Sequence, residues 1–237
     1  MDTVRAIQNE LDQFRDPEKA AFLPKFFQAF PGGYGEGDLF LGVTVPNQRK
    51  VAGKYYRLVS LEELRKLLKS KYHEHRLTAL FILVQNYDKA KSEPERKKLV
   101  DFYLSNLASV NSWDLVDSSA YKILGPYLQD KDKSILVDLA ADDNLWKQRV
   151  AIIATFHFIK QGDFAPTLKL ADMLLDHEHD LIHKAVGWML REVGKRNFEK
   201  EYHYLLQRYK EMPRTMLRYA IEKFDPALRK KFLAGEL

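Results

Sequence analysis

Apolar residues recur at intervals of three and four along nearly the whole chain, and this spacing predicts helices. Near the amino terminus, Asp2 can cap a helix that is apolar along one face. A second helix is expected to begin at Pro17, because proline is favoured in the first helical turn. This second helix carries four phenylalanines that we expect to pack in the core: Phe22, Phe26, Phe27 and Phe30.

The helical pattern is interrupted at residues 31–38, which read PGGYGEGD and hold four of the eleven glycines of the chain. So many glycines do not form a helix, and a loop or short hairpin is predicted there. Residues 39–45 could form a brief extended piece before Pro46 opens the next helix.

The remaining segments read as helices joined by short polar turns. Ser60 with Glu63, and Ser92 with Glu95, fit the capping box that starts a helix. Breaks are expected near residues 162–163, at residue 178 and near residues 212–213. The predicted fold class is all-α.

Four apolar helical segments recur at 36 ± 2 residues, beginning at His75, Trp113, Lys147 and His183. Helix pairs at this period are typical of helical repeat proteins, and HEAT-like pairs fit better than tetratricopeptide repeats, whose signature is not visible. We therefore expect a curved solenoid of HEAT-like helix pairs, with residues 1–237 forming a single domain. The second helix of each pair would line the concave side, which would present one cleft built from Trp113, Asp117, Arg149, Trp188 and Arg191.

Composition narrows the possible functions only modestly. A net charge of +5 is compatible with binding a polyanion but does not demonstrate it. The chain has no cysteine, which excludes disulfides, thiolate nucleophiles and cysteine metal sites. No apolar run is long enough to cross a membrane, and the amino terminus lacks the layout of a signal peptide, so a cytoplasmic protein is expected.

Five motifs, taken together and in order, resemble the AlkD-like family of alkylpurine DNA glycosylases. They are PEKA (17–20), FLGVTVPNQRK (40–50), SWDLVD (112–117), DNLWKQRVAI (143–152) and KAVGWMLRE (184–192). The resemblance covers most of the chain and implies a single-domain stack of HEAT-like helix pairs. It also implies hydrolysis of the bond between an N3- or N7-alkylated purine and its sugar, in double-stranded DNA.

The resemblance assigns roles to individual residues. The family's pattern of a Trp and an Asp four apart, an Arg one repeat later and a second Trp one repeat beyond implies four catalytic residues: Asp117, Trp113, Arg149 and Trp188. Arg191 matches a further cleft Arg that faces the DNA backbone. The DNA-binding set implied is Lys184, Arg191, Arg76, Lys195 and Thr44, although some members carry a larger polar residue where this chain has Thr44.

These residue types suit that chemistry. Glycosidases ordinarily use two carboxylates, but an alkylated purine is already cationic and leaves as a neutral base, so no general acid is needed. One carboxylate, Asp117, could stabilise the oxocarbenium-like sugar and position water. The rings of Trp113 and Trp188 would attract the cationic base, and Arg149, Lys184 and Arg191 would neutralise phosphates. No metal or cofactor is expected.

Other interpretations remain open. Each Trp taken alone could be a core residue, and Asp117 with Arg149 could be a structural ion pair. His177, His179 and His183 could be metal ligands, but the same stretch also reads as a helix start. The glycine-rich insertion at 31–38 occurs in a branch of the family whose members are not all active glycosylases. A non-catalytic binder of branched or distorted DNA is therefore the second hypothesis, and a protein-interaction scaffold is the third. A nucleoid-associated monomer is expected.

Overall fold

The computed structural model describes residues 2–237, and these residues are helical with no β-sheet. The all-α prediction is confirmed. The chain forms two compact units, Met1–Ser119 and Ala120–Leu237, and the boundary falls within helix α7. None of the helices in the described residues is long and apolar enough to cross a membrane.

Unit 1 holds the amino-terminal helices and the first turns of α7. Its elements are α1 (Thr3–Asp12), α2 (Pro17–Phe26), α3 (Val45–Tyr55), α4 (Leu61–Leu68), α5 (His73–Lys89), α6 (Glu93–Ser105), the 3₁₀ turn η1 (Leu107–Ser109) and α7 (Trp113–Tyr127).

Unit 2 holds the rest of α7 and the helices that follow it. These are α8 (Ser134–Ala140), α9 (Leu145–Ala154), α10 (Phe156–Lys160), α11 (Ala165–Met173), α12 (Asp180–Gly194), α13 (Phe198–Arg208), α14 (Arg214–Ala220), η2 (Ile221–Lys223) and α15 (Pro226–Ala234). The three predicted breaks all fall between helices.

The helices begin largely where the sequence predicts. Asp2 accepts a hydrogen bond from the Arg5 amide, and Ser60 and Glu63 form a complete capping box. The second predicted capping box is only half formed. Ser92 accepts from the Glu95 amide, but the Glu95 carboxylate accepts from the amide of Lys91, one residue before the N-cap.

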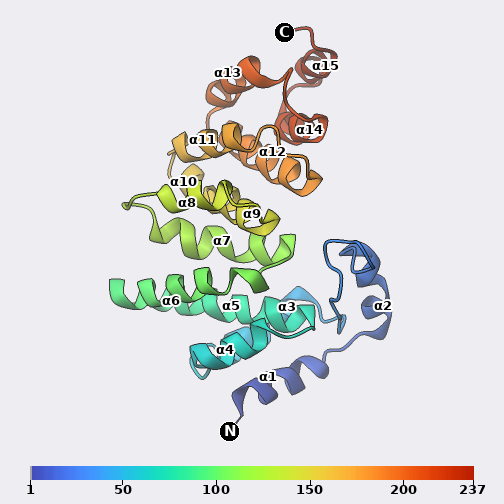
Figure 1. Ribbon diagram of the computed structural model, residues 1–237, viewed down its shortest axis with the longest axis vertical. Helices are drawn as coiled ribbons and strands as arrows, with labels where there is room; N and C mark the ends of the chain where they lie inside the picture. The colour runs from blue at the N-terminus through green and yellow to red at the C-terminus, as the bar shows by residue number, and fades with distance from the viewer. Residues whose placement is uncertain (1) are drawn as a thin grey trace. The chain divides into compact units, whose positions relative to one another are not determined.

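The interior of unit 1 is organised around α5. This helix is buried over nearly its whole length and packs against α3, α4 and α6, while α1 packs on α3 and α4. Figure 1 shows α2 and the loop after it lying to one side of α3, α4 and α5. None of the residues in α2 is fully buried, so that helix stands at the edge of the unit.

The expectation that the phenylalanine stripe forms core is wrong for three of its four members. Phe22, Phe26 and Phe30 are 60%, 51% and 50% exposed, and only Phe27 is buried. Phe22 and Phe26 lie on α2, which has the unit on one side only, and Phe30 lies beyond the end of α2 in the turns before the glycine-rich loop. Rings at helical spacing on such a helix cannot all face inward.

Residues 31–38 form turns, as their glycines predict, and the Glu36 carboxylate accepts a hydrogen bond from the Gly32 amide. The extended piece expected at residues 39–45 contains one isolated bridge, between Leu39 and Tyr72. Its backbone groups bind side chains of unit 1 in place of a strand partner.

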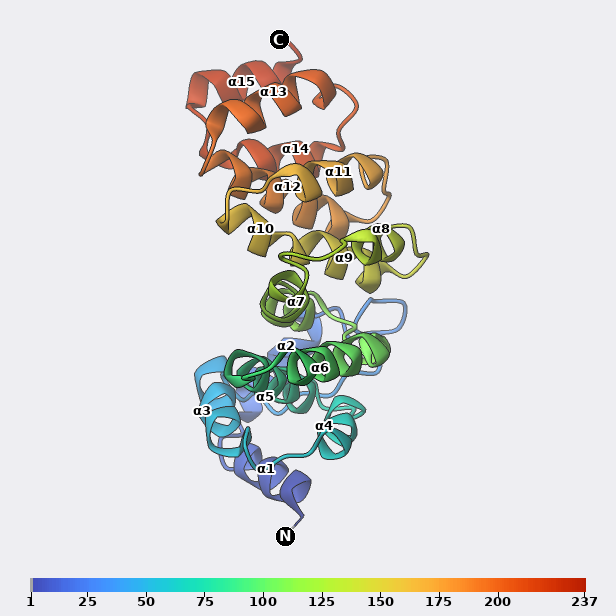
Figure 2. The same ribbon diagram turned by 90° about the vertical axis from the view of Figure 1, so that its left-hand side faces the viewer.

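Unit 2 is organised around α12, which packs against α9, α11, α13 and α14. Figure 2 shows α12 and α14 side by side. The contact depends on Gly187, since a Cβ there would lie 2.4 Å from the Met216 carbonyl oxygen and 2.6 Å from the Tyr219 Cβ. No larger residue allows α14 to come so close.

Unit 2 also buries a carboxyl group that lacks a full set of hydrogen-bond partners. Glu201 of α13 is buried, and its Oε1 atom makes no hydrogen bond. Burial raises its pKa from 4.5 to about 9, and the charge of Arg191 opposes the shift only in part. Glu201 therefore stays protonated at neutral pH in the folded protein, whereas the unfolded chain ionises it.

We expect the Glu201→Gln variant to be more stable than the parent at pH 8, by roughly 2 kcal/mol. Because the folded pKa is raised, the parent loses stability as pH rises from about 4.5 to about 9, and the variant should lose less. Urea unfolding at pH 5, 6.5 and 8 measures this, with Glu199→Gln on the exposed face of α13 as control. The same pH dependence in Glu201→Gln and the parent would contradict a protonated Glu201.

Candidate functional site

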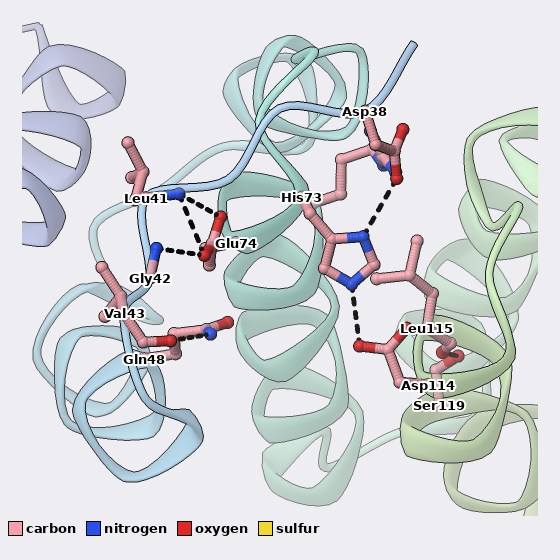
Figure 3. A network of polar contacts seen from close by, with 11 residues as sticks. Asp38, Leu41, Gly42, Val43, Gln48, His73, Glu74, Asp114, Leu115 and Ser119 are labelled. Atoms are coloured by element: carbon pink, nitrogen blue, oxygen red, sulfur yellow. Dashed lines mark hydrogen bonds and ion pairs between the residues drawn. The ribbon is translucent and has the colours of Figure 1, made fainter. Parts of the chain in front are cut away.

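The amino-terminal end of α5 anchors the segment that follows the glycine-rich loop. The Glu74 carboxylate accepts hydrogen bonds from the Leu41 amide at 3.0 Å and the Gly42 amide at 2.8 Å (Figure 3). Gly42 has a φ of +79°, and a Cβ there would lie 2.1 Å from the Asp16 carbonyl oxygen. Only glycine fits where this segment passes so close to the backbone at the start of α2. The segment is therefore held against the start of α2 on one side and against α5 on the other.

His73, the neighbour of Glu74, lies between two carboxylates. Its Nδ1 is 3.1 Å from Asp38 and its Nε2 is 2.8 Å from Asp114 on the first turn of α7 (Figure 3). Burial by itself lowers the pKa of His73, but the charge of Asp114 and the hydrogen bonds to both carboxylates outweigh it and raise the pKa from 6.5 to about 9. The imidazole is therefore charged at neutral pH.

Asp38 is shared between two cations. Besides His73, it accepts a hydrogen bond of 2.5 Å from the buried Arg76 guanidinium, which also donates to the Ser70 carbonyl. Burial raises the pKa of Asp38, but the bonds to His73 and Arg76 hold it below its usual value. Arg76, predicted from the sequence to bind DNA, is thus buried and engaged within the unit.

An aromatic stack connects this charge network to Trp113. Phe27 lies nearly parallel to Trp113, with ring centroids 5.5 Å apart, and its centroid is 4.6 Å from that of His73. Phe40 stacks on both Phe27 and His73. Phe26 meets Trp113 edge to face at 5.9 Å. Such offset and edge contacts are the favoured arrangements of aromatic rings.

These groups border a cavity of about 430 Å³, which we call the unit 1 cavity. The structure brings three of the predicted site residues to its wall, Trp113, Asp117 and Thr44. Phe26, Phe27, Phe40 and Lys19 also line it, together with the charged His73–Asp114 pair. Three carboxylates line the cavity, Glu74, Asp114 and Asp117, and aromatic walls beside negative charge suit a flat, positively charged ring.

Unit 2 holds the other predicted catalytic residues. The Trp188 ring of α12 is partly exposed and lies 5.9 Å from Phe156, which in turn contacts Tyr121. The Lys160 ammonium lies 4.4 Å from the Phe156 centroid and 4.6 Å from that of Tyr121. Trp188 therefore belongs to an aromatic and cationic cluster on unit 2.

Arg149 of α9 is buried and donates a 2.5 Å hydrogen bond to the Leu181 carbonyl in the first turn of α12. This contact fixes α9 against the helix that carries Trp188. The prediction that Arg149 and Trp188 share a single cleft with Trp113 and Asp117 stays a prediction.

The predicted DNA-binding cations of α12 all have acidic partners. Lys184 pairs with Asp180 at 2.5 Å, Arg191 pairs with Glu222, and Lys195 pairs with Glu192 at 2.5 Å. Arg196 shares Glu192 with Lys195. The Lys184–Asp180 pair is the most exposed of these, and exposed pairs contribute little to stability and can exchange a carboxylate for a phosphate. Glu192, in contrast, is buried.

The three histidines considered as metal ligands are engaged in local contacts. His177 contacts Gln148, His179 caps α12 through the Leu181 amide, and His183 contacts the His177 carbonyl. Within residues 2–237, no group of three or more His, Asp or Glu side chains is arranged to hold a metal ion.

Sequence reasoning missed several residues of the unit 1 cavity. Phe26 and Phe27 were assigned to the core, and His73 was not considered. Asp114 also lines the cavity and has no role in the sequence analysis. The sequence signal for this region is the polar run His73–Arg76 directly before the mostly apolar residues 77–84.

Comparison with known proteins identifies both the fold and the family of this chain. Its fold is similar to a solved helical structure, a predicted DNA alkylation repair enzyme from Enterococcus faecalis, with a TM-score of 0.68 and 17% identity. The match covers 90% of this chain and 97% of that chain, and it shows the shared fold, an α-helical solenoid.

The family described as DNA alkylation repair enzyme matches residues 7–224, and the chain belongs to this family. No curated protein matches the chain. Family membership supports a role in DNA repair, with DNA as the partner.

We expect His73→Gln to lower the free energy of unfolding by roughly 3–5 kcal/mol at pH 6, because it leaves Asp114 and Asp38 without their shared cation. The folded pKa of His73 is raised, so its stabilisation is complete below about pH 6.5 and is lost as pH rises through about 9. Urea unfolding at pH 6 and pH 9.5 measures both effects.

The matched control is His203→Gln, which removes an exposed histidine on α13. The difference between His73→Gln and the parent should shrink at pH 9.5. An equal difference at the two pH values would show that His73 is neutral in the folded protein.

Proposed function

We propose that this protein is a DNA glycosylase that excises N3- or N7-alkylated purines from double-stranded DNA by hydrolysis of the N-glycosidic bond. The observation that carries the proposal is the unit 1 cavity, in which Trp113 and the Phe26 and Phe27 rings border the same space as Asp117. Aromatic faces attract a cationic base, and a carboxylate stabilises the sugar cation that forms when the base leaves.

The three carboxylates of the cavity have different tasks in this mechanism. Glu74 accepts hydrogen bonds from the Leu41 and Gly42 amides and holds the backbone. Asp114 accepts from the His73 imidazolium at 2.8 Å, so a neighbouring cation compensates its charge. We assign the electrostatic role to Asp117, one helical turn after Trp113 on the same face of α7. Its negative charge would stabilise the oxocarbenium-like sugar and orient a water molecule toward C1′.

The bond changes are simple. The electron pair of the N-glycosidic bond passes to the cationic purine, which leaves as a neutral base and needs no proton. Water adds to C1′ and gives up its proton to Asp117 or to solvent. The reaction needs no second acid, metal or cofactor, which agrees with a site that offers one carboxylate for the chemistry.

Unit 2 would contribute DNA contacts of its own. Trp188 would contact the damaged nucleotide or its neighbour, and Arg149 would orient α12 through the Leu181 carbonyl. Lys184, Arg191 and Lys195 would bind phosphates, and Thr44 would contact DNA at the rim of the unit 1 cavity. The burial of Arg76 gives it a structural role, holding Asp38 beside His73.

A DNA substrate would place the protein in the cytoplasm at the nucleoid. The monomeric state stays a prediction. HEAT-like pairing of the helices is likewise a prediction, supported by the recurrence of α5, α7, α9 and α12 at a regular spacing.

We expect Asp117→Asn to slow the release of 7-methylguanine from duplex DNA by at least ~100-fold, because the amide cannot stabilise a sugar cation. Binding to undamaged duplex should be unchanged or slightly tighter, since a negative charge is lost. Single-turnover base release and fluorescence anisotropy measure the two quantities. Asp101→Asn on the exposed face of α6 serves as the control.

The outcomes separate the two DNA hypotheses. Full-rate release by Asp117→Asn would refute the assigned mechanism. No release by the parent, with duplex binding intact, would favour a non-catalytic binder of branched DNA. In that case deletion of residues 32–37, which form turns in unit 1 and leave Asp38 in place, should weaken binding to a four-way junction more than to duplex.

We expect Phe26→Leu to slow release of the methylated base by roughly 3- to 30-fold with little change in stability. The ring is half exposed and meets Trp113 edge to face, so it contributes more to the cavity wall than to the core. Phe22→Leu is the matched control, because Phe22 is also exposed on α2 but does not line the cavity. Equal rates for both variants would remove Phe26 from the site.

A further inference from the structure

Unit 2 carries a polar groove that none of the assigned roles explains. It has a volume of about 480 Å³ and lies between α12, α14 and the carboxy-terminal helix α15, and we call it the α12–α14 groove. Its cationic side chains are Lys184, Arg218 and Arg229, and the Thr215 and Tyr219 hydroxyl groups lie beside them. Of these residues, only Lys184 is among the expected DNA-binding set.

The shape of the groove follows from the close packing of α12 on α14 at Gly187. Lys184 is one turn before Gly187 on α12, while Thr215 and Arg218 lie one turn apart on α14. The contact therefore brings the Lys184 ammonium, the Thr215 hydroxyl and the Arg218 guanidinium to one groove. Figure 2 shows the two helices side by side in this region.

The acidic residues of the groove already have partners, whereas two of its arginines have none. Asp180 pairs with Lys184, and Glu222 pairs with Arg191 and Lys223. Within the described residues, Arg218 and Arg229 form no ion pair, and the buried Nε of Arg229 makes no hydrogen bond. Both guanidinium groups border the groove without a carboxylate partner, and an anionic oxygen in the groove would pair with them.

The groove is also continuous with the residue proposed to contact the damaged nucleotide. Lys184 and Trp188 are four residues apart on α12, so they share one helix face at a distance of about 6 Å along the axis. A strand whose base contacts Trp188 would place a nearby phosphate within reach of this groove.

We propose that the α12–α14 groove binds a phosphodiester of the DNA backbone, with Arg218 and Arg229 as its principal ligands. The planar guanidinium fork matches the two free oxygens of a phosphodiester, and the Thr215 and Tyr219 hydroxyls can donate to the same oxygens. The site rests on the proposed function, since it presumes that DNA is the substrate, and it adds a second anchor that holds the strand beside Trp188. Such a phosphate contact would fix the position of the DNA along the protein and would not depend on the base sequence.

The test compares a double variant of the groove with a double variant of matched charge. Arg218→Gln with Arg229→Gln removes two cations from the groove, while Lys200→Gln with Lys210→Gln removes two exposed cations on and after α13. Affinity for unmodified duplex is measured by fluorescence anisotropy from 50 to 300 mM salt. Thermal melting of each variant verifies that it is folded.

We expect the groove variant to bind duplex at least ~10-fold more weakly at 100 mM salt, and the slope of log K against log salt to fall in magnitude by about 1, because one phosphate contact is lost. The control variant should keep both the parent affinity and the parent slope to within a few tenths. Arg218→Lys with Arg229→Lys should keep the slope and recover part of the affinity, since the charges remain and the guanidinium forks do not.

Two results would overturn the proposal that the α12–α14 groove binds a phosphodiester. One is a groove variant with the affinity and salt slope of the parent, and the other is an equal loss in the Lys200 and Lys210 control. Failure of the glycosylase proposal has a different signature, namely a parent that binds duplex and releases no methylated base. In that case the difference between the two double variants still decides whether the groove binds the backbone.

Discussion

The geometry of unit 1 depends on the buried imidazolium of His73 and the carboxylates on either side of it. Asp38 and Asp114 hold it in the charged state, and Arg76 supplies a second positive charge to Asp38. Removing charges from water is unfavourable unless each one has a partner, so each member of this group requires the others. The group links three separate pieces of chain: the end of the glycine-rich loop, the start of α5 and the first turn of α7.

The position of Trp113 follows from that link. Asp114 is bound to His73, so the preceding Trp113 is brought against Phe27, and Asp117 follows one turn later on the wall of the unit 1 cavity. The proposed chemistry thus depends on contacts within the protein as well as on contacts with the substrate. The His73–Asp114 pair holds the first turn of α7, Phe27 packs on both His73 and Trp113, and the cavity lies where these elements meet.

The cations of α12 in unit 2 lie near the surface, whereas the charged groups around His73 in unit 1 are buried. These cations are on the face of α12 that carries Trp188, and most are paired with exposed carboxylates. Such pairs are weak in water and exchange readily for phosphate. In the proposed function, unit 1 would hold the base in its cavity and the cations of unit 2 would bind the DNA backbone.

The sequence by itself determined the helical class, most helix starts and the placement of Trp113 and Asp117 one turn apart on the same helix face. Helical periodicity, N-caps and the spacing of those two residues are local features, and local sequence is enough to specify them. Tertiary structure alone decided which polar groups are buried and which apolar groups are exposed. Phe22 and Phe26 have the spacing of residues on a core helix, but α2 lies at the edge of the unit and both rings are exposed. Arginine commonly contacts DNA, but Arg76 is buried in the interior. Burial depends on contacts between residues such as Asp38, His73 and Asp114, which are far apart in the chain, and no helical period encodes them.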